Sequence, residues 1–500
     1  MTPISVALSD DAATTRLGAD LAAAAKAGDV FALHGDLGAG KTTLARGFVR
    51  QMAGDPDLDV PSPTFTFVQT YEGRIPVRHF DLYRIGGMAD LDELGFEDEQ
   101  ADTATLIEWP ERAGEALPAE RVDIELAHEG EGRRATISGA PKAMARIARS
   151  LDIRAFLAGA GAEHAHRTFL LGDASTRAYE TIYDGEDPVR ILMNAPRQPD
   201  GPPIRDGKPY SQIAHLAESV TPFVAIGKAL VANGFSAPQI HAQNLDSGLL
   251  LIEHLGSQGV LDENGTPVAQ RYITSAEVLA AIHQKEWPRD MEAAPGVVHR
   301  LPAYDREAMA IETELVTDWY MPAQAGKPTS AKDRAEYAAA WSSAFDRLEM
   351  VEKSIVLRDY HSPNLIWRGD RQGLDRVGII DFQDALWGPS TYDVASLAQD
   401  ARVTISPELE NEIVAAYLAA RKAGGAFDEA GFREAYAIMA AQRNSKILGI
   451  FIRLNVRDGK PAYLRHLPRI RDYVSRSLTH PALAQLRDFY ESRGLLKDAS

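Results

Sequence analysis

A glycine-rich segment near the start of the chain, GDLGAGKTT from Gly35 to Thr43, has the composition of a phosphate-binding loop. Its glycines let backbone N–H groups surround phosphate oxygens at the start of a helix, its lysine neutralises the β and γ phosphates, and its first threonine can bind magnesium. An apolar run precedes the segment and apolar residues at helical spacing follow it, as a strand–loop–helix site requires. The residues expected to bind ATP are Gly35, Gly38, Gly40, Lys41, Thr42 and Thr43.

Two acidic residues further along are candidates to complete this site. Asp81 stands in HFDLYR and Glu108 in TLIEWP, each at the end of an apolar stretch. Strands deliver such groups to the edge of a sheet, and a P-loop enzyme needs carboxylates to hold magnesium and to orient the attacking water. Taken singly, each residue is more often a solvated acid at a strand end.

A second set of polar residues lies far along the chain, in RDYHSPN. It places Asp359 and Asn364 five positions apart, the spacing of a kinase catalytic loop. An aspartate there accepts the proton of a substrate hydroxyl, and the asparagine carbonyl oxygen reaches magnesium on the ATP phosphates. Seventeen residues after Asn364, Asp381 ends an apolar run in VGIIDFQDA, where a further metal-binding aspartate is expected. The pattern predicts Asp359 as the base and Asn364 and Asp381 as magnesium ligands.

The nucleotide loop that should accompany these residues is less regular. FLLGDASTRAYETIYDG has Gly172 where protein kinases use three glycines, so Ser175 and its polar neighbours would contact the phosphates. The strand-like run 189–196 has no lysine. The cation that clamps the phosphates is therefore unidentified, with Arg177 and Arg190 as candidates.

A hinge for adenine is predicted in LLLIEHLG, residues 249–256. Its apolar residues indicate a buried strand, and backbone groups near Glu253 would pair with the base. The alternative is an ordinary sheet edge.

The composition limits the possible classes of protein. At 500 residues the chain exceeds the roughly 250 to 300 residues of one hydrophobic core, so two or three domains are expected. It has no cysteine, which excludes disulfides and thiolate chemistry, and no run of about 18 apolar residues, so we expect a cytoplasmic protein with no membrane partner. Residues 1–140 hold 25 acidic against 12 basic residues, which disfavours direct nucleic-acid binding by this part.

Four motifs in the front part, GDLGAGKTT, SPTF, HFDLYR and IEWPER, together resemble the TsaE family, the ATPase subunit of bacterial tRNA threonylcarbamoyladenosine synthesis. The resemblance implies that Lys41 binds phosphate, that Thr42 and Glu108 bind magnesium, and that Asp81 assists hydrolysis. The residues that would shape the site are Thr64 and Trp109. It also implies docking onto TsaB and TsaD proteins, which would handle the tRNA whose adenosine 37 is modified.

The rear part resembles the aminoglycoside phosphotransferase-like kinases, a small-molecule branch of the protein-kinase fold. GDASTRAYE, ILMNAP, RDYHSPNLIW, IIDFQDALWGPSTYDVASLAQDAR and AQRNSKILGIF look like the AmgK subgroup, which phosphorylates N-acetylmuramate and N-acetylglucosamine at carbon 1. Asn194 departs from the aspartate that is typical of that subgroup. We expect His361 to have a structural role and Asp384 and Asp393 to fix the loop and helix beyond the metal.

The sequence thus predicts an α/β P-loop NTPase domain at residues 1–141, a linker helix and kinase N-lobe at 142–255, and a mainly helical kinase C-lobe at 256–500. The expected cofactors are ATP and Mg²⁺, and the expected function is a tRNA-modification ATPase fused to an amino-sugar kinase. Two alternatives stay open for the rear part. In one alternative the rear part is a catalytically silent nucleotide sensor, which the absence of a lysine from residues 189–196 favours. In the other it is a kinase for another small substrate, such as an aminoglycoside or choline.

Overall fold

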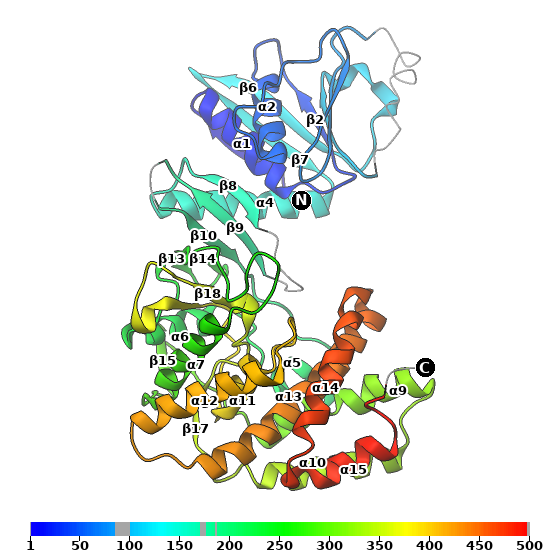
Figure 1. Ribbon diagram of the computed structural model, residues 1–500. Helices are drawn as coiled ribbons and strands as arrows, with labels where there is room; N and C mark the ends of the chain where they lie inside the picture. Colours follow the sequence, from blue (N-terminus) through cyan, green and yellow to red (C-terminus); the bar gives the residue numbers. More distant parts are fainter. Residues whose placement is uncertain (1, 86–100, 171–176, 186–187, 498–500) are drawn as a thin grey trace. The chain divides into compact units, whose positions relative to one another are not determined.

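The apolar run ahead of the P-loop forms a buried strand in the computed structural model (Figure 1). This strand, β2 (Val30–His34), lies in a seven-stranded sheet of order β1-β7-β6-β2-β5-β4-β3. β2 runs parallel to β5 and β6, and β4 runs parallel to β5, which gives the parallel centre of an α/β fold. The other strands are β1 (Ile4–Leu8), β3 (Val68–Tyr71), β4 (Val77–Asp81), β5 (Ala104–Glu108), β6 (Val122–Glu129) and β7 (Gly132–Gly139).

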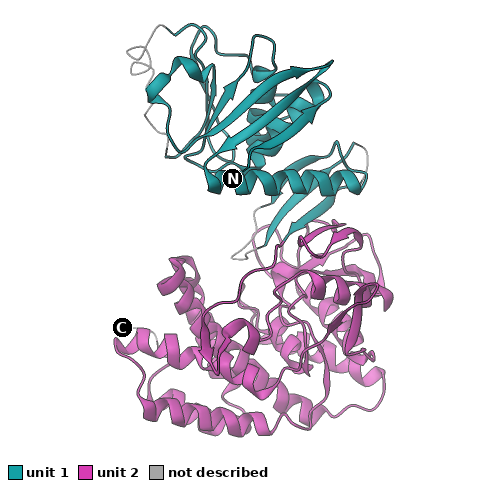
Figure 2. Ribbon diagram, turned by 180° about the vertical axis from the view of Figure 1, so that it is seen from behind, with its two compact units in different colours: residues 1–194 teal, residues 195–500 magenta. Residues whose placement is uncertain are grey.

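The structure describes residues 2–85, 101–170, 177–185 and 188–497, and the chain divides into two compact units, residues 1–194 and 195–500 (Figure 2). The predicted nucleotide-loop residues Gly172 and Ser175 lie outside the described residues.

Helices α1 (Asp11–Ala24) and α2 (Lys41–Ala53) pack together and share one core with the sheet. Their close approach depends on two glycines. A Cβ atom at Gly18 would lie 2.2 Å from the carbonyl oxygen of Leu44, and one at Gly47 would lie 2.1 Å from that of Thr15. Any larger residue at either position would push apart the helix that begins at the P-loop and its neighbour.

The first unit also contains α4 (Pro141–Gly159), which begins at a proline as the sequence predicts, and three antiparallel strands. These strands are β8 (His166–Leu170), β9 (Ala178–Tyr183) and β10 (Arg190–Asn194). The division between the compact units therefore falls at residue 194, beyond the predicted domain boundary near residue 141, which stays a prediction.

A buried carboxylate joins α1 to α4 and β8. Asp20 is 3% exposed and accepts hydrogen bonds from Arg154 (Nη2, 2.9 Å) and Arg167 (Nη1, 2.9 Å). Arg167 also pairs with Glu180 of β9 at 2.7 Å, and its carbonyl oxygen accepts a hydrogen bond from Gln51 of α2 at 2.5 Å. Strands β8 and β9 are thus tied to α1 and α2.

The second unit contains two antiparallel strand pairs around the predicted catalytic loop, β17 (Lys353–Val356) with β20 (Leu386–Pro389) and β18 (Leu365–Trp367) with β19 (Val377–Ile379). Its further strands are β11 (Pro203–Arg205), β12 (Lys208–Pro209), β13 (Ile240–Asn244), β14 (Leu249–Glu253), β15 (Asp290–Ala294) and β16 (Val297–Arg300).

Helices make up most of the second unit (Figure 1). The longest, α13 (Glu429–Asp458), contributes to a core of aromatic and aliphatic side chains that it shares with α8, α10, α14 and α15. The α- and π-helices described in this unit are α5 (Tyr210–Ile213), α6 (Thr221–Ala232), α7 (Ala269–Gln284), α8 (Arg306–Thr313), η3 (Val316–Tyr320), α9 (Met321–Ala325), α10 (Ala331–Asp346), α11 (Thr391–Ala398), α12 (Pro407–Ala423), α13, α14 (Leu467–Ser477) and α15 (Ala484–Ser492). Within the described ranges, none of the helices has the length and apolar character needed to cross a bilayer.

We predict that Asp20→Asn destabilises the first unit by about 3 to 5 kcal/mol, because it leaves the Arg154 and Arg167 guanidinium groups buried without their shared counterion. Urea unfolding followed by hydrogen exchange of the α1 and β8 segments measures the effect. The control is Asp290→Asn, whose ion pair with Arg300 is exposed and contributes at most about 1 kcal/mol. Equal free energies of unfolding for the two variants would contradict the role of Asp20 as the shared counterion of Arg154 and Arg167.

Candidate active sites

Strand alternation places three polar side chains of the first unit on one face of its sheet. Val77 of β4 and Leu106 of β5 belong to the core under α1 and α2, whereas Phe80 and Ile107 belong to the core on the other face. Because side chains alternate along a strand, His79, Asp81 and Glu108 face the same side as Val77 and Leu106. β4 and β5 are parallel with Asp81 opposite Glu108, so both carboxylates lie at the strand ends beside the start of α2.

Glu108 is held between the P-loop helix and β4. The Thr42 hydroxyl donates to its Oε2 at 2.9 Å, and His79 Nε2 lies 2.9 Å from its Oε1. Glu108 is 2% exposed and His79 is fully buried, so the carboxylate is fixed by these contacts rather than by water. The sequence motifs assign His79 no role, although its place two residues before Asp81 puts it on the same strand face.

Asp81 anchors the SPTF loop. Its Oδ2 accepts hydrogen bonds from the hydroxyls of Ser62 and Thr64, the latter at 2.8 Å, and its Oδ1 accepts the Tyr83 N–H at 3.0 Å. The carboxylate is 4% exposed. This arrangement brings the loop to the P-loop, and Thr64 lines the same cavity as Lys41.

Lys41 lies among its own loop carbonyls. Its Nζ donates to the carbonyl oxygens of Gly35 at 2.6 Å and Asp36 at 3.0 Å, and it lies 3.6 Å from the centre of the Trp109 ring. Burial lowers the pKa of Lys41, while Glu108 and other nearby carboxylates oppose that shift. Trp109 has a left-handed backbone (φ 60°), which stores strain beside the phosphate-binding loop.

A cavity of about 400 Å³ joins these groups. Its lining also includes Arg133 of β7, which no motif had indicated. Arg133 donates to Asp11 at 2.7 Å, and a Cβ atom at Gly40 would lie 3.2 Å from its Nε, so this guanidinium is packed against the loop backbone. It reaches the loop because β7 is a neighbour of β6 in the sheet, a long-range pairing that the local sequence does not reveal.

The donor set at the P-loop suits magnesium. Hydroxyl and carboxylate oxygens are the ligands this ion prefers, and the Thr42 hydroxyl and Glu108 carboxylate already lie within hydrogen-bonding distance of each other. These two residues would hold the ion, which would neutralise charge on the phosphates.

In the second unit, the two strand pairs bring the predicted kinase residues together. The catalytic loop runs from β17 to β18, and the metal loop runs from β19 to β20. Because β17 pairs with β20 and β18 with β19, both loops leave the two strand pairs at the same end. The backbone joins them, since Ile380 N–H donates to the carbonyl oxygen of Asn364 at 3.1 Å.

Asn364 links the predicted base to the predicted metal ligand. Its Nδ2 donates to the Asp359 carbonyl oxygen at 2.9 Å and lies 3.5 Å from Asp381 Oδ2. Because the amide nitrogen makes both contacts, its carbonyl oxygen can serve as a ligand, and with the Asp381 carboxylate it forms an oxygen donor set that suits magnesium. The Asp359 side chain is 40% exposed, as a group that meets a diffusing substrate must be.

Two buried carboxylates, Asp393 and Asp400, accept hydrogen bonds from backbone N–H groups in and beside the catalytic loop. Asp393, fully buried on α11, accepts the N–H groups of Leu357 at 2.6 Å and Arg358 at 2.8 Å. Asp400 accepts the Ser362 N–H at 2.8 Å. Burial lowers the pKa of His361, against the effect of Asp400 and Asp359 nearby, which suits the predicted structural role of this side chain.

Other predicted residues take part in structural contacts. Glu253 ends β14, where its N–H donates to the carbonyl of Gln239 and its carboxylate lies 3.3 Å from Arg368, so pairing with adenine would use its carbonyl oxygen or the residues beyond. Arg190 pairs with Asp184 at 3.3 Å. Asn194 accepts a hydrogen bond from Arg149 at 2.7 Å through its amide oxygen.

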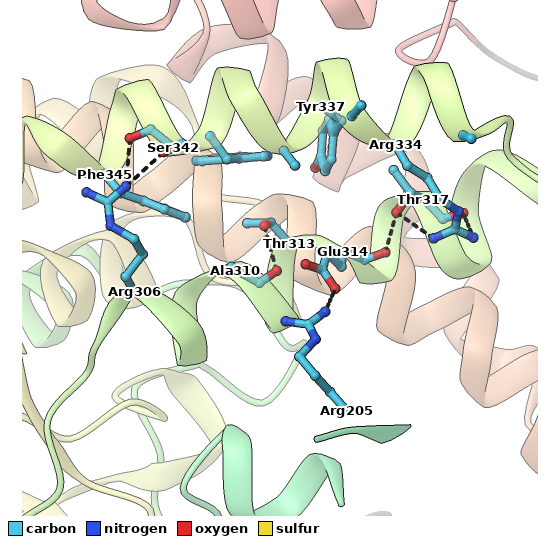
Figure 3. Close-up of a pocket in the computed structure, with 14 residues that line it drawn as sticks. Arg205, Arg306, Ala310, Thr313, Glu314, Thr317, Arg334, Tyr337, Ser342 and Phe345 are labelled. Carbon is cyan, nitrogen blue, oxygen red and sulfur yellow. Dashed lines mark hydrogen bonds and ion pairs between the residues drawn. The ribbon is translucent and has the colours of Figure 1, made fainter. Parts of the chain in front are cut away.

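A cavity of about 670 Å³ lies between α8, η3 and α10 of the second unit (Figure 3). None of its lining residues is a predicted site residue. Its three arginines contact neighbouring side chains, Arg205 pairing with Glu314, Arg306 bonding to Ser342 and Arg334 bonding to Thr317 (Figure 3). We therefore assign this cavity no catalytic role.

Comparison with known proteins gives two family matches. Residues 8–136 match the family model of the threonylcarbamoyl adenosine biosynthesis protein TsaE, and residues 166–434 match that of the phosphotransferase enzyme family. The chain is 37% identical to the N-acetylmuramate/N-acetylglucosamine kinase of Caulobacter vibrioides, over 67% of this chain and 94% of the relative. It is 40% identical to the tRNA threonylcarbamoyladenosine biosynthesis protein TsaE of Bacillus subtilis, over 23% of this chain and 70% of the relative.

Among solved structures, the chain is similar to a microcompartment-associated aminopropanol kinase, with 15% identity and a TM-score of 0.42 over 69% of this chain and 99% of that one.

We predict that Glu108→Gln removes the effect of magnesium on the affinity of the front site for ATP, because the ion loses one charged ligand. The affinity measured with magnesium present should fall on the order of tenfold or more. Titration of Asp381→Ala protein, which isolates the front site, with and without EDTA measures this. Glu129→Gln, at an exposed position of β6, is the control. A magnesium effect that survives in the Glu108 variant would rule out this ligand.

Proposed function

This chain belongs to the phosphotransferase enzyme family and carries a TsaE domain ahead of its phosphotransferase domain, and from this we propose that it is a bifunctional ATP-using protein. The front part hydrolyses ATP in the synthesis of threonylcarbamoyladenosine in tRNA. The rear part transfers the γ-phosphoryl group of ATP to the anomeric hydroxyl of N-acetylmuramate or N-acetylglucosamine. The observation that supports the proposal is that two separate groups of polar residues come together, Lys41, Thr42, Asp81 and Glu108 around one cavity of the first unit and Asp359, Asn364 and Asp381 in the second unit.

In the front part, Lys41 binds the phosphates once they displace it from the carbonyl oxygens of its own loop. Asp81 orients the attacking water, and its hydrogen bonds from Ser62 and Thr64 keep the SPTF loop in place while it does so. Thr42 and Glu108 hold the magnesium ion, which supplies charge neutralisation when bound. TsaB- and TsaD-type proteins are the proposed partners, and they contact the tRNA.

In the rear part, Asp359 accepts the proton of the anomeric hydroxyl. The hydroxyl oxygen forms a bond to the γ phosphorus of ATP, the bond from that phosphorus to the β,γ-bridging oxygen breaks, and the products are the sugar 1-phosphate and ADP. Asn364 and Asp381 hold magnesium, which supplies charge neutralisation on the phosphates. Catalysis here depends on positioning, because little covalent chemistry falls to the protein.

The two activities should be separable by single substitutions. Asp359→Ala is expected to lower sugar phosphorylation by at least about 100-fold and to leave ATP hydrolysis by the front site intact, because it removes only the base of the rear site. Lys41→Ala should do the reverse. Both activities are measured on the full chain, with the partner proteins added for hydrolysis. Loss of both activities in one folded variant would contradict two independent sites.

The substrate proposal is tested by incubating the full chain with ATP and each amino sugar and detecting the 1-phosphate by mass spectrometry. Asp359→Ala protein is the matched control. Phosphorylation of choline or an aminoglycoside in place of an amino sugar would favour a different small-molecule kinase. Nucleotide binding with no phosphorylated product would favour the silent sensor, which the absence of lysine from the β10 sequence RILMN supports.

A further inference from the structure

A cluster of buried charged side chains lies next to the catalytic loop, and the proposed mechanism does not use it. Glu312 of α8 is fully buried, and it forms ion pairs with Arg358, which precedes the predicted base, and with Lys446 of α13. The Arg358 side chain is 3% exposed and the Lys446 side chain is 12% exposed, with Lys446 Nζ 2.9 Å from Glu312 Oε1. Two cations therefore share one carboxylate.

The other oxygen of Glu312 is also occupied. Oε2 accepts hydrogen bonds from the Tyr304 hydroxyl at 2.5 Å and from Gln442 Nε2 at 2.9 Å. Burial alone would raise the pKa of Glu312, but Lys446, Arg358 and these hydrogen bonds outweigh it and hold the pKa at about 2. The carboxylate is therefore charged at neutral pH. Gln442 and Lys446 lie four residues apart on α13, so both reach Glu312 from one helix face.

Arg358 has a backbone conformation that arginine rarely adopts. Its φ is 71°, in the left-handed region that favours glycine, so the residue is strained where the chain enters the catalytic loop. Its N–H donates to Asp393, and its side chain donates to the carbonyl oxygen of Ala214 at 2.8 Å as well as to Glu312. Arg358 is thus held through its backbone on one side and through its guanidinium on the other, directly before Asp359.

A contribution to folding stability does not by itself explain why such a cluster of buried charges is present. A buried ion pair costs much of its electrostatic gain in desolvation, and apolar residues of similar size often stabilise a core equally well. What charged, hydrogen-bonded groups add is a single defined geometry. Here that geometry fixes the residue next to the predicted base, and the effect of losing it should appear in catalysis.

We propose that Glu312 is a positioning residue for phosphoryl transfer, which acts through Arg358 to hold the strained backbone that presents Asp359. Lys446 and Gln442 fix Glu312 to α13, which gives the motif AQRNSKILGIF a role in the reaction. The inference rests on the proposed kinase function.

The test compares two matched buried carboxylates in the full chain. Glu410 of α12 is also contacted by an arginine, a tyrosine and a glutamine, namely Arg476, Tyr436 at 2.8 Å and Gln399 at 2.7 Å, but none of these three partners belongs to the catalytic loop. Glu312→Gln should lower kcat for sugar phosphorylation at least tenfold per folded molecule, with KM for ATP and sugar changed less than threefold. Glu410→Gln should lower the unfolding temperature by a similar amount and keep the wild-type kcat.

Arg358→Lys provides a second test that does not depend on Glu312→Gln folding. Lysine keeps the positive charge but lacks the planar guanidinium that donates to both the Ala214 carbonyl oxygen and Glu312. The kcat for sugar phosphorylation should therefore fall at least tenfold, while ATP hydrolysis at the front site is unchanged. A wild-type kcat in Arg358→Lys, or in folded Glu312→Gln, would overturn the proposal. A change confined to KM for the sugar would also overturn it and would make the cluster part of substrate binding. Absence of sugar phosphorylation in the wild-type chain would instead refute the kinase function itself.

Discussion

A carboxylate that leaves water needs hydrogen-bond donors around it, and this requirement organises both halves of the chain. In the first unit, Glu108 is buried between Thr42 and His79, which fixes the distance from the P-loop helix to the end of β4. In the second unit, Asp393 takes two backbone N–H groups of the catalytic loop. Each carboxylate links an element that carries chemistry to an element of the core. Without these hydrogen bonds, the strand ends and loops that carry the phosphate-binding residues would not be held in position.

The two sites use this constraint differently. The front site is closed around its lysine, which rests on loop carbonyls and on the Trp109 ring, so nucleotide must displace existing contacts. The rear site leaves its base partly exposed and fixes the backbone on either side of it, through Asp393 before Asp359 and Asp400 after it. A lysine held by its own loop suits a site in which bound phosphates replace those contacts. An exposed base on a rigid backbone suits a kinase that meets a small diffusing sugar.

The motifs predicted much of this arrangement, because the residues concerned are close in sequence or end adjacent strands. The P-loop, Asp81 and Glu108 meet as expected because β2, β5 and β4 are parallel neighbours, and the fold class is confirmed by the two family matches. Arg133 and Lys446 could not be predicted in the same way. Arg133 reaches the P-loop because β7 pairs with β6 in the sheet. Lys446 reaches Glu312 because α13 packs against α8, which is distant in the sequence. The contact of Asp20 with Arg154 and Arg167 was equally hidden, since ion pairs between distant residues leave no local pattern.

The central claim is that one polypeptide binds ATP at two independent sites, and calorimetric titration of the intact chain with a non-hydrolysable ATP analogue and magnesium tests it most directly. The account predicts two nucleotides bound per chain, one in Lys41→Ala protein and one in Asp381→Ala protein. A single nucleotide per folded wild-type chain would contradict it.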